Sequence, residues 1–196
     1  MGVSPQEVEL WKSGYGLIAG VDEAGRGPLA GPVVAAAVIF PPYTQIPGVK
    51  DSKLLPPRKR EEVFRMLIGK AVDWSIGIVE AETVDQVNIL QATRIAMREA
   101  VEGLRIKPDF VLVDALSLEL SCPSQGIIRG DSLCQCIGGA SIIAKVFRDW
   151  LMERVSALFP QYEFHRHKGY PTLLHREKIK KHGKSILHRK TFSSPE

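Results

Sequence analysis

The chain has 196 residues, of which 44% are hydrophobic, and a formal net charge of +4 at pH 7. This length suits one domain, or one domain with an extension, and is sufficient to bury a sizeable core. No stretch reaches the roughly 20 apolar residues of a membrane span, and the N-terminus lacks an apolar signal core. We therefore expect neither a membrane protein nor a secreted one, whereas the net charge alone selects no class of partner.

The cysteines and histidines do not form a recognisable metal-binding pattern. Cys122, Cys134 and Cys136 are odd in number and lack the paired CxxC spacing of a zinc site. We expect them to be reduced, buried thiols in a cytoplasmic protein, because disulfides are rare in reducing compartments. The five histidines, from His165 to His188, also lack metal-ligand spacing, and most are expected to be solvated or to face phosphate.

In chain order, the apolar pattern predicts an α/β fold with a mixed sheet. Residues 15–22, 32–40 and 72–80 read as strands, with a helix at 57–70 that carries proline at its start. One or two helices are predicted between residues 83 and 104, and two short strands within 108–116 and 126–128. A single long helix is predicted from near Asp131, as its cap, to a stop before Pro160. This order favours a mixed β-sheet flanked by helices over an all-parallel arrangement.

The last part of the chain differs from the rest in charge. From Arg166 to Lys190 it is dense in Lys, Arg and His and contains one acid, Glu177. A local basic patch of this kind indicates nucleic-acid binding better than total charge does. We predict a main domain over residues 1–160 and a basic helical C-terminal region over residues 161–196, packed on or beside it.

Two of the apolar runs end in acidic residues. The first ends in Asp22 and Glu23, and a later one ends in Asp114. If these strands are neighbours, their carboxylates meet at one sheet edge, which Asp131 could also reach. Convergent carboxylates repel one another unless a cation neutralises them, and oxygen ligands favour Mg²⁺ or Mn²⁺. Any one of these acids, taken alone, is more often structural, so the pattern points to a divalent-metal site without identifying the reaction.

A glycine-rich turn follows the first pair of acids. Gly25 and Gly27 would let the backbone approach a ligand closely, and Arg26 offers a planar fork to a phosphate. An ordinary structural turn is the alternative. No GxGxxG or Walker lysine pattern follows, which weighs against nucleotide binding.

The stretch GVDEAGRGPLAGPVVAAAV, at residues 20–38, resembles the signature of the ribonuclease HII family. Further landmarks of that family follow in order: DSK at 51–53, NILQAT at 88–93, VLVDA at 111–115, GD at 130–131, ASIIAKVFRD at 140–149, HKGYPT at 167–172 and HRKTF at 188–192. The resemblance thus extends from about residue 16 to residue 192. It implies a ribonuclease H-like catalytic domain with a helical C-terminal extension, which cuts the RNA strand of RNA–DNA hybrids and cuts 5′ to ribonucleotides embedded in duplex DNA.

The resemblance also implies roles for individual residues. The metal-binding catalytic carboxylates would be Asp22, Glu23, Asp114 and Asp131, with Mn²⁺ or Mg²⁺ as cofactor. The residues that bind the substrate would be Gly25, Arg26 and Gly27 at the 2′-hydroxyl, Lys53 at the backbone and Tyr170 at the RNA-to-DNA junction. Asp131 is expected to be the mobile or water-orienting acid, since it begins a helix rather than ending a core strand.

Two other classes of function remain open on the residues alone. One is a nucleic-acid-binding module that kept the fold and lost the chemistry, although all four expected acids are present. The other is a different nuclease of the same superfold, such as a junction resolvase or transposase core. The sequence also leaves open whether the helix face bearing Ser141, Lys145 and Arg148 contacts the site or packs beneath it. A monomer is expected.

Overall fold

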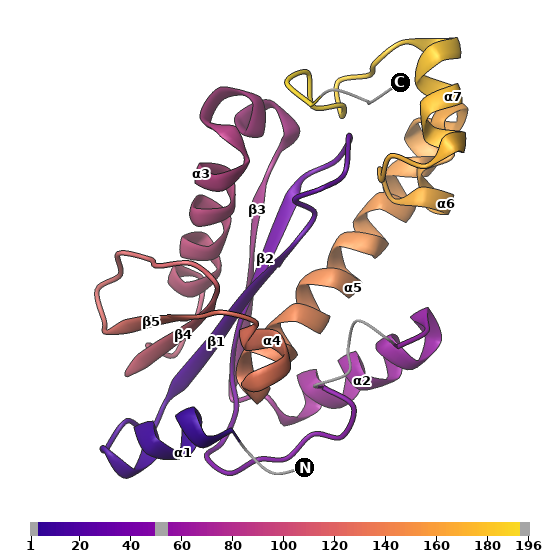
Figure 1. The fold of residues 1–196 in the computed structure, drawn as a ribbon. Coiled ribbons are helices and arrows are strands. Elements are labelled where there is room, and N and C mark those ends of the chain that lie inside the picture. The colour runs from indigo at the N-terminus through magenta and orange to yellow at the C-terminus, as the bar shows by residue number, and fades with distance from the viewer. Residues whose placement is uncertain (1–3, 50–54, 193–196) are drawn as a thin grey trace.

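The computed structural model describes residues 4–49 and 55–192, and within them a five-stranded sheet forms the centre of the molecule (Figure 1). The strands are β1 (Ile18–Ala24), β2 (Val33–Ile39), β3 (Asp73–Val79), β4 (Phe110–Asp114) and β5 (Ser124–Ile127), in the order β3-β2-β1-β4-β5. The β1–β2 and β2–β3 pairs are antiparallel, whereas β1–β4 and β4–β5 are parallel. The predicted mixed sheet is therefore confirmed.

Helices cover both faces of the sheet, with α3 on one side and α2 and α5 on the other (Figure 1). The helical elements are α1 (Pro5–Lys12), α2 (Pro57–Lys70), α3 (Ala81–Glu102), α4 (Gly130–Leu133), α5 (Gln135–Leu158), the 3₁₀ turn η2 (Pro160–Tyr162), α6 (Phe164–His167) and α7 (Leu173–His182). None of the helices within residues 4–49 and 55–192 has the length and apolar character needed to span a bilayer.

The core consists of two layers separated by the sheet. Strand β2 is buried at every position, and its side chains alternate between the layers: Val33 and Ala35 join the α3 layer, while Ala36 joins the α5 layer. A strand buried on both faces reads as a continuous apolar run. At Gly20 of β1, an added Cβ would lie 2.1 Å from the backbone of Cys136, so the start of α5 packs directly on the strand that carries Asp22.

The long helix predicted from Asp131 is interrupted. Cys134 has extended backbone angles and separates the short α4 from α5. The carboxylate of Glu7, in α1, accepts hydrogen bonds from the N–H groups of Gln135 (2.9 Å) and Cys136 (3.1 Å), and thus caps the new helix start. The prediction of Asp131 as the cap is also wrong, because the cap position of α4 is Arg129 and Asp131 lies within the first turn.

Between residues 83 and 104 the sequence predicts one or two helices, and α3 is two helical segments joined at Asn88. That residue has φ 70° and ψ 166°, outside the helical region. Its side-chain oxygen accepts from the N–H groups of Leu90 (3.0 Å) and Gln91 (3.1 Å), which caps the second segment.

The C-terminal elements η2, α6 and α7 gather at the end of α5 that is remote from α1 (Figure 1). Their core contains three histidines, His167, His175 and His188, which are 6%, 0% and 1% exposed and surround the ring of Phe164. The expectation that most histidines are solvated is therefore wrong, because these rings serve as packing groups. Cys134 and Cys136 are buried free thiols as expected, while Cys122 is half-buried.

Candidate active site

Two of the predicted acids come from adjacent parallel strands. Val21 of β1 pairs with Val113 of β4, and each is followed directly by an aspartate, Asp22 or Asp114. Strand β1 continues to Ala24, two residues past the predicted end at residue 22, so Glu23 as well as Asp22 lies within the strand. The two aspartates are therefore neighbours at one edge of the sheet.

Burial and the neighbouring carboxylates raise the pKa values of Asp22 and Glu23 at this edge. Asp22 is only 5% exposed, and its pKa is raised well above the usual value by burial and by the nearby Glu23 and Asp114. The pKa of Glu23 is also raised by burial, although Arg26, 3.2 Å from its Oε1, opposes the shift. Such mutual repulsion between carboxylates is the condition that a cation relieves.

The fourth acid approaches from the β5–α4 connection. Asp114 Oδ1 accepts a hydrogen bond from the N–H of Gly130 (2.7 Å), and the next residue, Asp131, is 4% exposed. The four acids thus come from β1, β4 and the first turn of α4, which adjoin one another. Among the described residues, however, no group of three or more His, Cys, Asp or Glu side chains is arranged closely enough to hold a metal ion as it stands.

A cleft of about 370 Å³ opens beside Glu23. Its lining contains predicted substrate-binding residues from two distant parts of the chain, the β1–β2 loop and the C-terminal region, together with residues of α2 and α5: Glu23, Ala24, Gly25, Arg26, Gly27, Arg60, Ser141, Ile142, Lys145 and Tyr170. The structure therefore brings Gly25, Arg26, Gly27 and Tyr170 together. Lys53, the remaining predicted contact, lies outside the described residues.

Gly25 allows the loop to take its observed path. Its φ is +99°, a value that favours glycine, and an added Cβ would lie 2.2 Å from Nε of the buried Arg148. By contrast, a Cβ at Gly27 would meet nothing within 4 Å, so that side of the loop is open. Arg26 is 43% exposed through its side chain and bonds to Glu23, which places a cation next to the acids.

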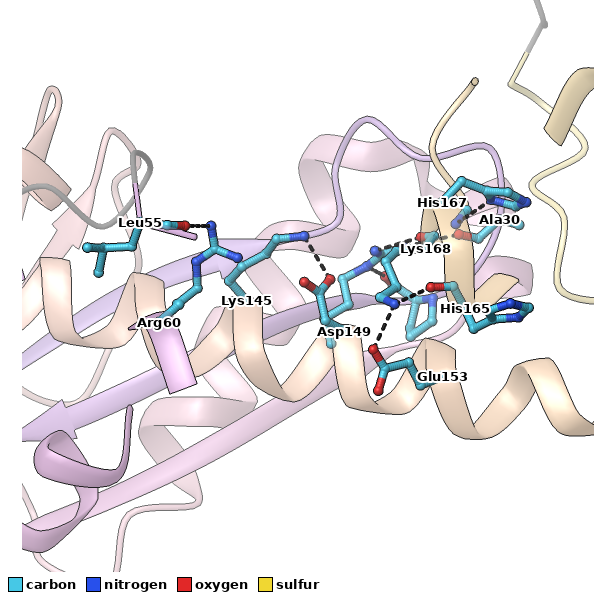
Figure 2. Close-up of polar contacts among 12 residues, drawn as sticks. Ala30, Leu55, Arg60, Lys145, Asp149, Glu153, His165, His167 and Lys168 are labelled. Carbon is cyan, nitrogen blue, oxygen red and sulfur yellow. Dashed lines mark hydrogen bonds and ion pairs between the residues drawn. The ribbon is translucent and has the colours of Figure 1, made fainter. Parts of the chain in front are cut away.

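Tyr170 lies opposite this loop and is 37% exposed. Lys145 Nζ is 5.3 Å and the Arg148 guanidinium 5.7 Å from the centre of its ring. Lys145 is held by Asp149 at 2.7 Å, as Figure 2 shows. Both cations lie over the ring, and the exposed part of Tyr170 can pack on a sugar or base while Lys145 attracts phosphate.

The face of α5 that bears Ser141, Lys145 and Arg148 both contacts the cleft and packs beneath it. Ser141 and Lys145 line the cleft, and the Ser141 side chain hydrogen-bonds to Asp22, which lowers the carboxyl pKa slightly against the larger effects of burial and charge. Arg148 is fully buried and donates to the carbonyl oxygens of Ala30 (3.1 Å), Pro32 (3.0 Å) and Lys168 (3.0 Å). It thereby ties the β1–β2 loop to the segment before Tyr170.

Sequence reasoning missed one charged residue of the cleft lining. Arg60, in α2, is joined to the lining only by tertiary packing, and it donates to the carbonyl of Leu55 at 2.9 Å (Figure 2). Nothing in the PPRKR stretch distinguishes it from its basic neighbours. Lys168, in the C-terminal region, donates hydrogen bonds to Glu153 (2.8 Å) and to the carbonyl of His165 (Figure 2).

Comparison with known proteins agrees with this arrangement. The sequence model of the family described as Ribonuclease HII matches residues 19–194. The chain belongs to the ribonuclease HII family. The ribonuclease HII of Desulfitobacterium hafniense is 49% identical over 189 residues, which cover 96% of this chain and 73% of that protein. Members of the family are endoribonucleases, so this chain is a hydrolase of the ribonuclease H type.

Solved structures support the same family and fold. The ribonuclease H2 of Pyrococcus horikoshii is 30% identical, with a TM-score of 0.74 and coverage of 91% of this chain and 94% of that one. The RNase HII in a PCNA:RNase HII complex from Archaeoglobus fulgidus is 25% identical, with a TM-score of 0.77 and coverage of 92% and 96%. The ribonuclease H-like fold expected from the resemblance is therefore confirmed.

Proposed function

We propose that this ribonuclease HII cuts the phosphodiester bond on the 5′ side of a ribonucleotide, both in RNA–DNA hybrids and at single ribonucleotides in duplex DNA. The products would carry 3′-hydroxyl and 5′-phosphate ends. One observation carries the proposal: the edge where Asp22 and Asp114 emerge adjoins a cleft lined by the Gly25–Gly27 loop and Tyr170. Acids that can bind metal thus lie beside groups able to read a sugar and a phosphate.

The donor set fits a hard divalent cation. We propose that Asp22, Glu23, Asp114 and Asp131 hold Mg²⁺ or Mn²⁺, since all four supply oxygen and none supplies sulfur or nitrogen. Bound there, two such ions would activate the attacking water and stabilise the leaving oxygen. Because no three of the described acids are already arranged around one point, binding would draw their side chains together.

The chain itself would position the substrate. The open side of the Gly25–Gly27 loop can approach the 2′-hydroxyl, the group by which a protein distinguishes RNA from DNA at one nucleotide. Arg26 would hold the adjacent phosphate, and Tyr170 would stack on the sugar or base at the junction. A backbone contact by Lys53 stays a prediction.

The C-terminal region belongs to the substrate-binding side in this proposal. We infer a catalytic unit over residues 1–160 and a basic region over 161–196 that completes the cleft, since Tyr170 comes from the latter. One chain supplies every residue named for the cleft, which supports a monomer. The free cysteines fit the cytoplasmic location that we also propose.

The proposal is tested with a labelled DNA duplex that contains one ribonucleotide, incubated with Mg²⁺ or Mn²⁺. Wild type should cut 5′ to the ribonucleotide, Asp22→Asn should lose activity by at least about 100-fold, and an all-DNA duplex should stay intact. Glu119→Gln, at an exposed acid outside the cleft, is the matched control and should retain activity. Binding without metal-dependent cleavage would favour a nucleic-acid-binding module instead.

A further inference from the structure

Arg189, near the end of the chain, is the focus of an unusual set of hydrogen bonds. Its side chain is fully buried, and its guanidinium donates to the carbonyl oxygens of Gly25, Arg26, Pro28 and Gly31, over distances of 2.5 to 3.1 Å. All four acceptors belong to the loop between β1 and β2. Burial lowers the pKa of Arg189 to about 10, so the group is still charged at neutral pH.

Burying this cation is costly unless polar groups surround it. Among the described residues no carboxylate forms an ion pair with Arg189, and the loop carbonyls are its hydrogen-bond acceptors. A buried pair of apolar residues would stabilise the fold at lower cost. The arrangement is therefore better explained by what it does to the loop than by stability alone.

The hydrogen bonds determine which way the loop peptides face. In a trans peptide the C=O and N–H groups point in opposite directions, and the described residues contain no cis bond. Since the carbonyls of Gly25 and Arg26 turn toward Arg189, the N–H groups of Arg26 and Gly27 turn away from it. Neither N–H has an acceptor among the described residues, and both belong to the lining of the cleft.

We propose that Arg189 is a positioning residue for ribonucleotide recognition: it turns the Gly25–Gly27 peptides so that their N–H groups face the substrate. This inference rests on the proposed role of that loop at the 2′-hydroxyl. Arg189 itself stays buried behind the loop and does not touch the nucleic acid.

The segment that carries Arg189 is held firmly in place. The Arg189 N–H donates to the carbonyl of Leu29 (2.8 Å), and the ring of Phe192 lies 4.9 Å from the guanidinium. Asp85 of α3 accepts from the N–H groups of Lys190 (2.7 Å) and Thr191 (2.9 Å) and from the Thr191 hydroxyl (2.6 Å). Helix α3 therefore anchors the segment through Asp85.

Lysine cannot replace this arginine. Its ammonium is a single point with three donors, whereas the four carbonyls are met by a planar fork with five. Arg189→Lys keeps the charge and most of the volume but cannot orient all of the loop peptides. The substitution thus separates orientation from electrostatic attraction.

The test measures binding without divalent metal, so that no cleavage occurs. Dissociation constants are compared for a duplex with one ribonucleotide and for the same duplex with deoxyribonucleotides only. For wild type, the dissociation constant of the all-DNA duplex should exceed that of the duplex with one ribonucleotide, and their ratio measures discrimination. In Arg189→Lys this ratio should fall about tenfold, the scale of losing one or two hydrogen bonds, while the all-DNA constant stays within about twofold.

Two control variants separate positioning from other effects. Lys190→Gln removes an exposed charge from the same segment and should weaken both complexes equally, which leaves the ratio unchanged. Asp73→Asn perturbs a buried, well-bonded acid at the opposite end of the sheet and should lower stability without altering the ratio.

The outcomes are distinct. If wild type does not discriminate, the proposed role of the loop fails, and the role of Arg189 with it. If wild type discriminates and folded Arg189→Lys shows the same ratio of dissociation constants, only the inference about Arg189 is overturned. The inference is also overturned if Asp73→Asn lowers that ratio as much as Arg189→Lys does. If Arg189→Lys does not fold, Asp85→Asn decides: a lowered ratio supports the inference and an unchanged ratio overturns it.

Discussion

His175 and His188 meet through their Nε2 atoms, 3.1 Å apart, inside the C-terminal region. The N–H of Ser185 donates to Nδ1 of His188 (2.9 Å), so the hydrogen of this neutral ring is on Nε2 and is donated to His175. His175 can then donate from Nδ1 to the carbonyl of Tyr170 (3.0 Å). This chain of two neutral imidazoles connects the end of the molecule to the backbone of the cleft tyrosine.

Acid should therefore destabilise the protein over a defined range. Burial lowers the pKa values of His175 and His188 from 6.5 to about 4, with the charge of His167 adding to the effect at His175 and those of His175, Lys184 and His167 adding to it at His188. Because the unfolded chain takes up these protons first, the stabilisation is complete above about pH 6.5 and is lost as the pH falls toward 4. The loss is at most about 1.4 kcal/mol per pH unit for each histidine. Thermal melts from pH 8 to pH 4 measure it.

A matched pair of variants isolates the cause. His175→Gln removes one buried imidazole and should give a lower melting temperature at pH 8 but a shallower decline in acid. His182→Gln, at an exposed histidine, should keep the full decline. Equal declines in both variants would show that the buried rings are not responsible.

The sequence predicted the sheet and the acids because both depend on local patterns. Runs such as VVAAAVI are visible without tertiary information, and parallel neighbouring strands bring Asp22 and Asp114 to the same edge. The interruption at Cys134 was not predictable, because it depends on Glu7 capping a helix that starts 128 residues later. A capping acid so distant in sequence leaves no local signal.

The buried histidines and Arg189 escaped prediction for a similar reason. Arginine is mostly exposed and histidine is intermediate in burial, so a basic stretch normally indicates a solvated surface. Their burial depends on partners that sequence spacing does not reveal, namely ring stacking between His167 and His175 at 4.2 Å and loop carbonyls more than 150 residues away. The HRKTF landmark indicated family membership without indicating this role.

Asp22→Asn should stabilise the metal-free protein while abolishing activity. The wild-type pKa is raised, so stability is greatest with Asp22 protonated and is lost as the pH rises through that pKa. Asparagine keeps an oxygen that can accept from the N–H of Glu23 (2.7 Å in wild type) and removes the charge. In EDTA at pH 8 we expect the melting temperature to rise by a few degrees, where about 1 kcal/mol corresponds to about 2–4 °C.

With Mn²⁺ added, wild type should have a higher melting temperature than Asp22→Asn, the reverse of the order expected in EDTA. A cation that binds only the folded state stabilises it by about 2.7 kcal/mol at 100 times its dissociation constant, and Asp22→Asn should gain much less than wild type. Glu119→Gln should behave as wild type in both buffers. An equal gain from Mn²⁺ in wild type and Asp22→Asn would contradict a cation site that includes Asp22.

Asp131→Asn tests the acid that approaches from α4. Asp131 is 4% exposed and follows Gly130, whose N–H donates a hydrogen bond to Asp114. It is therefore held beside the acids of β1 and β4, although it belongs to α4. If Asp131 orients the attacking water, its loss should lower kcat by about 100-fold or more at saturating metal and leave duplex binding within about twofold. Ser132→Ala is the matched neighbour, since the Ser132 hydroxyl bonds only locally, to the carbonyl of Arg129 at 2.9 Å, and should leave kcat unchanged. Near-normal turnover of Asp131→Asn at saturating metal would remove Asp131 from the reaction and leave catalysis to Asp22, Glu23 and Asp114.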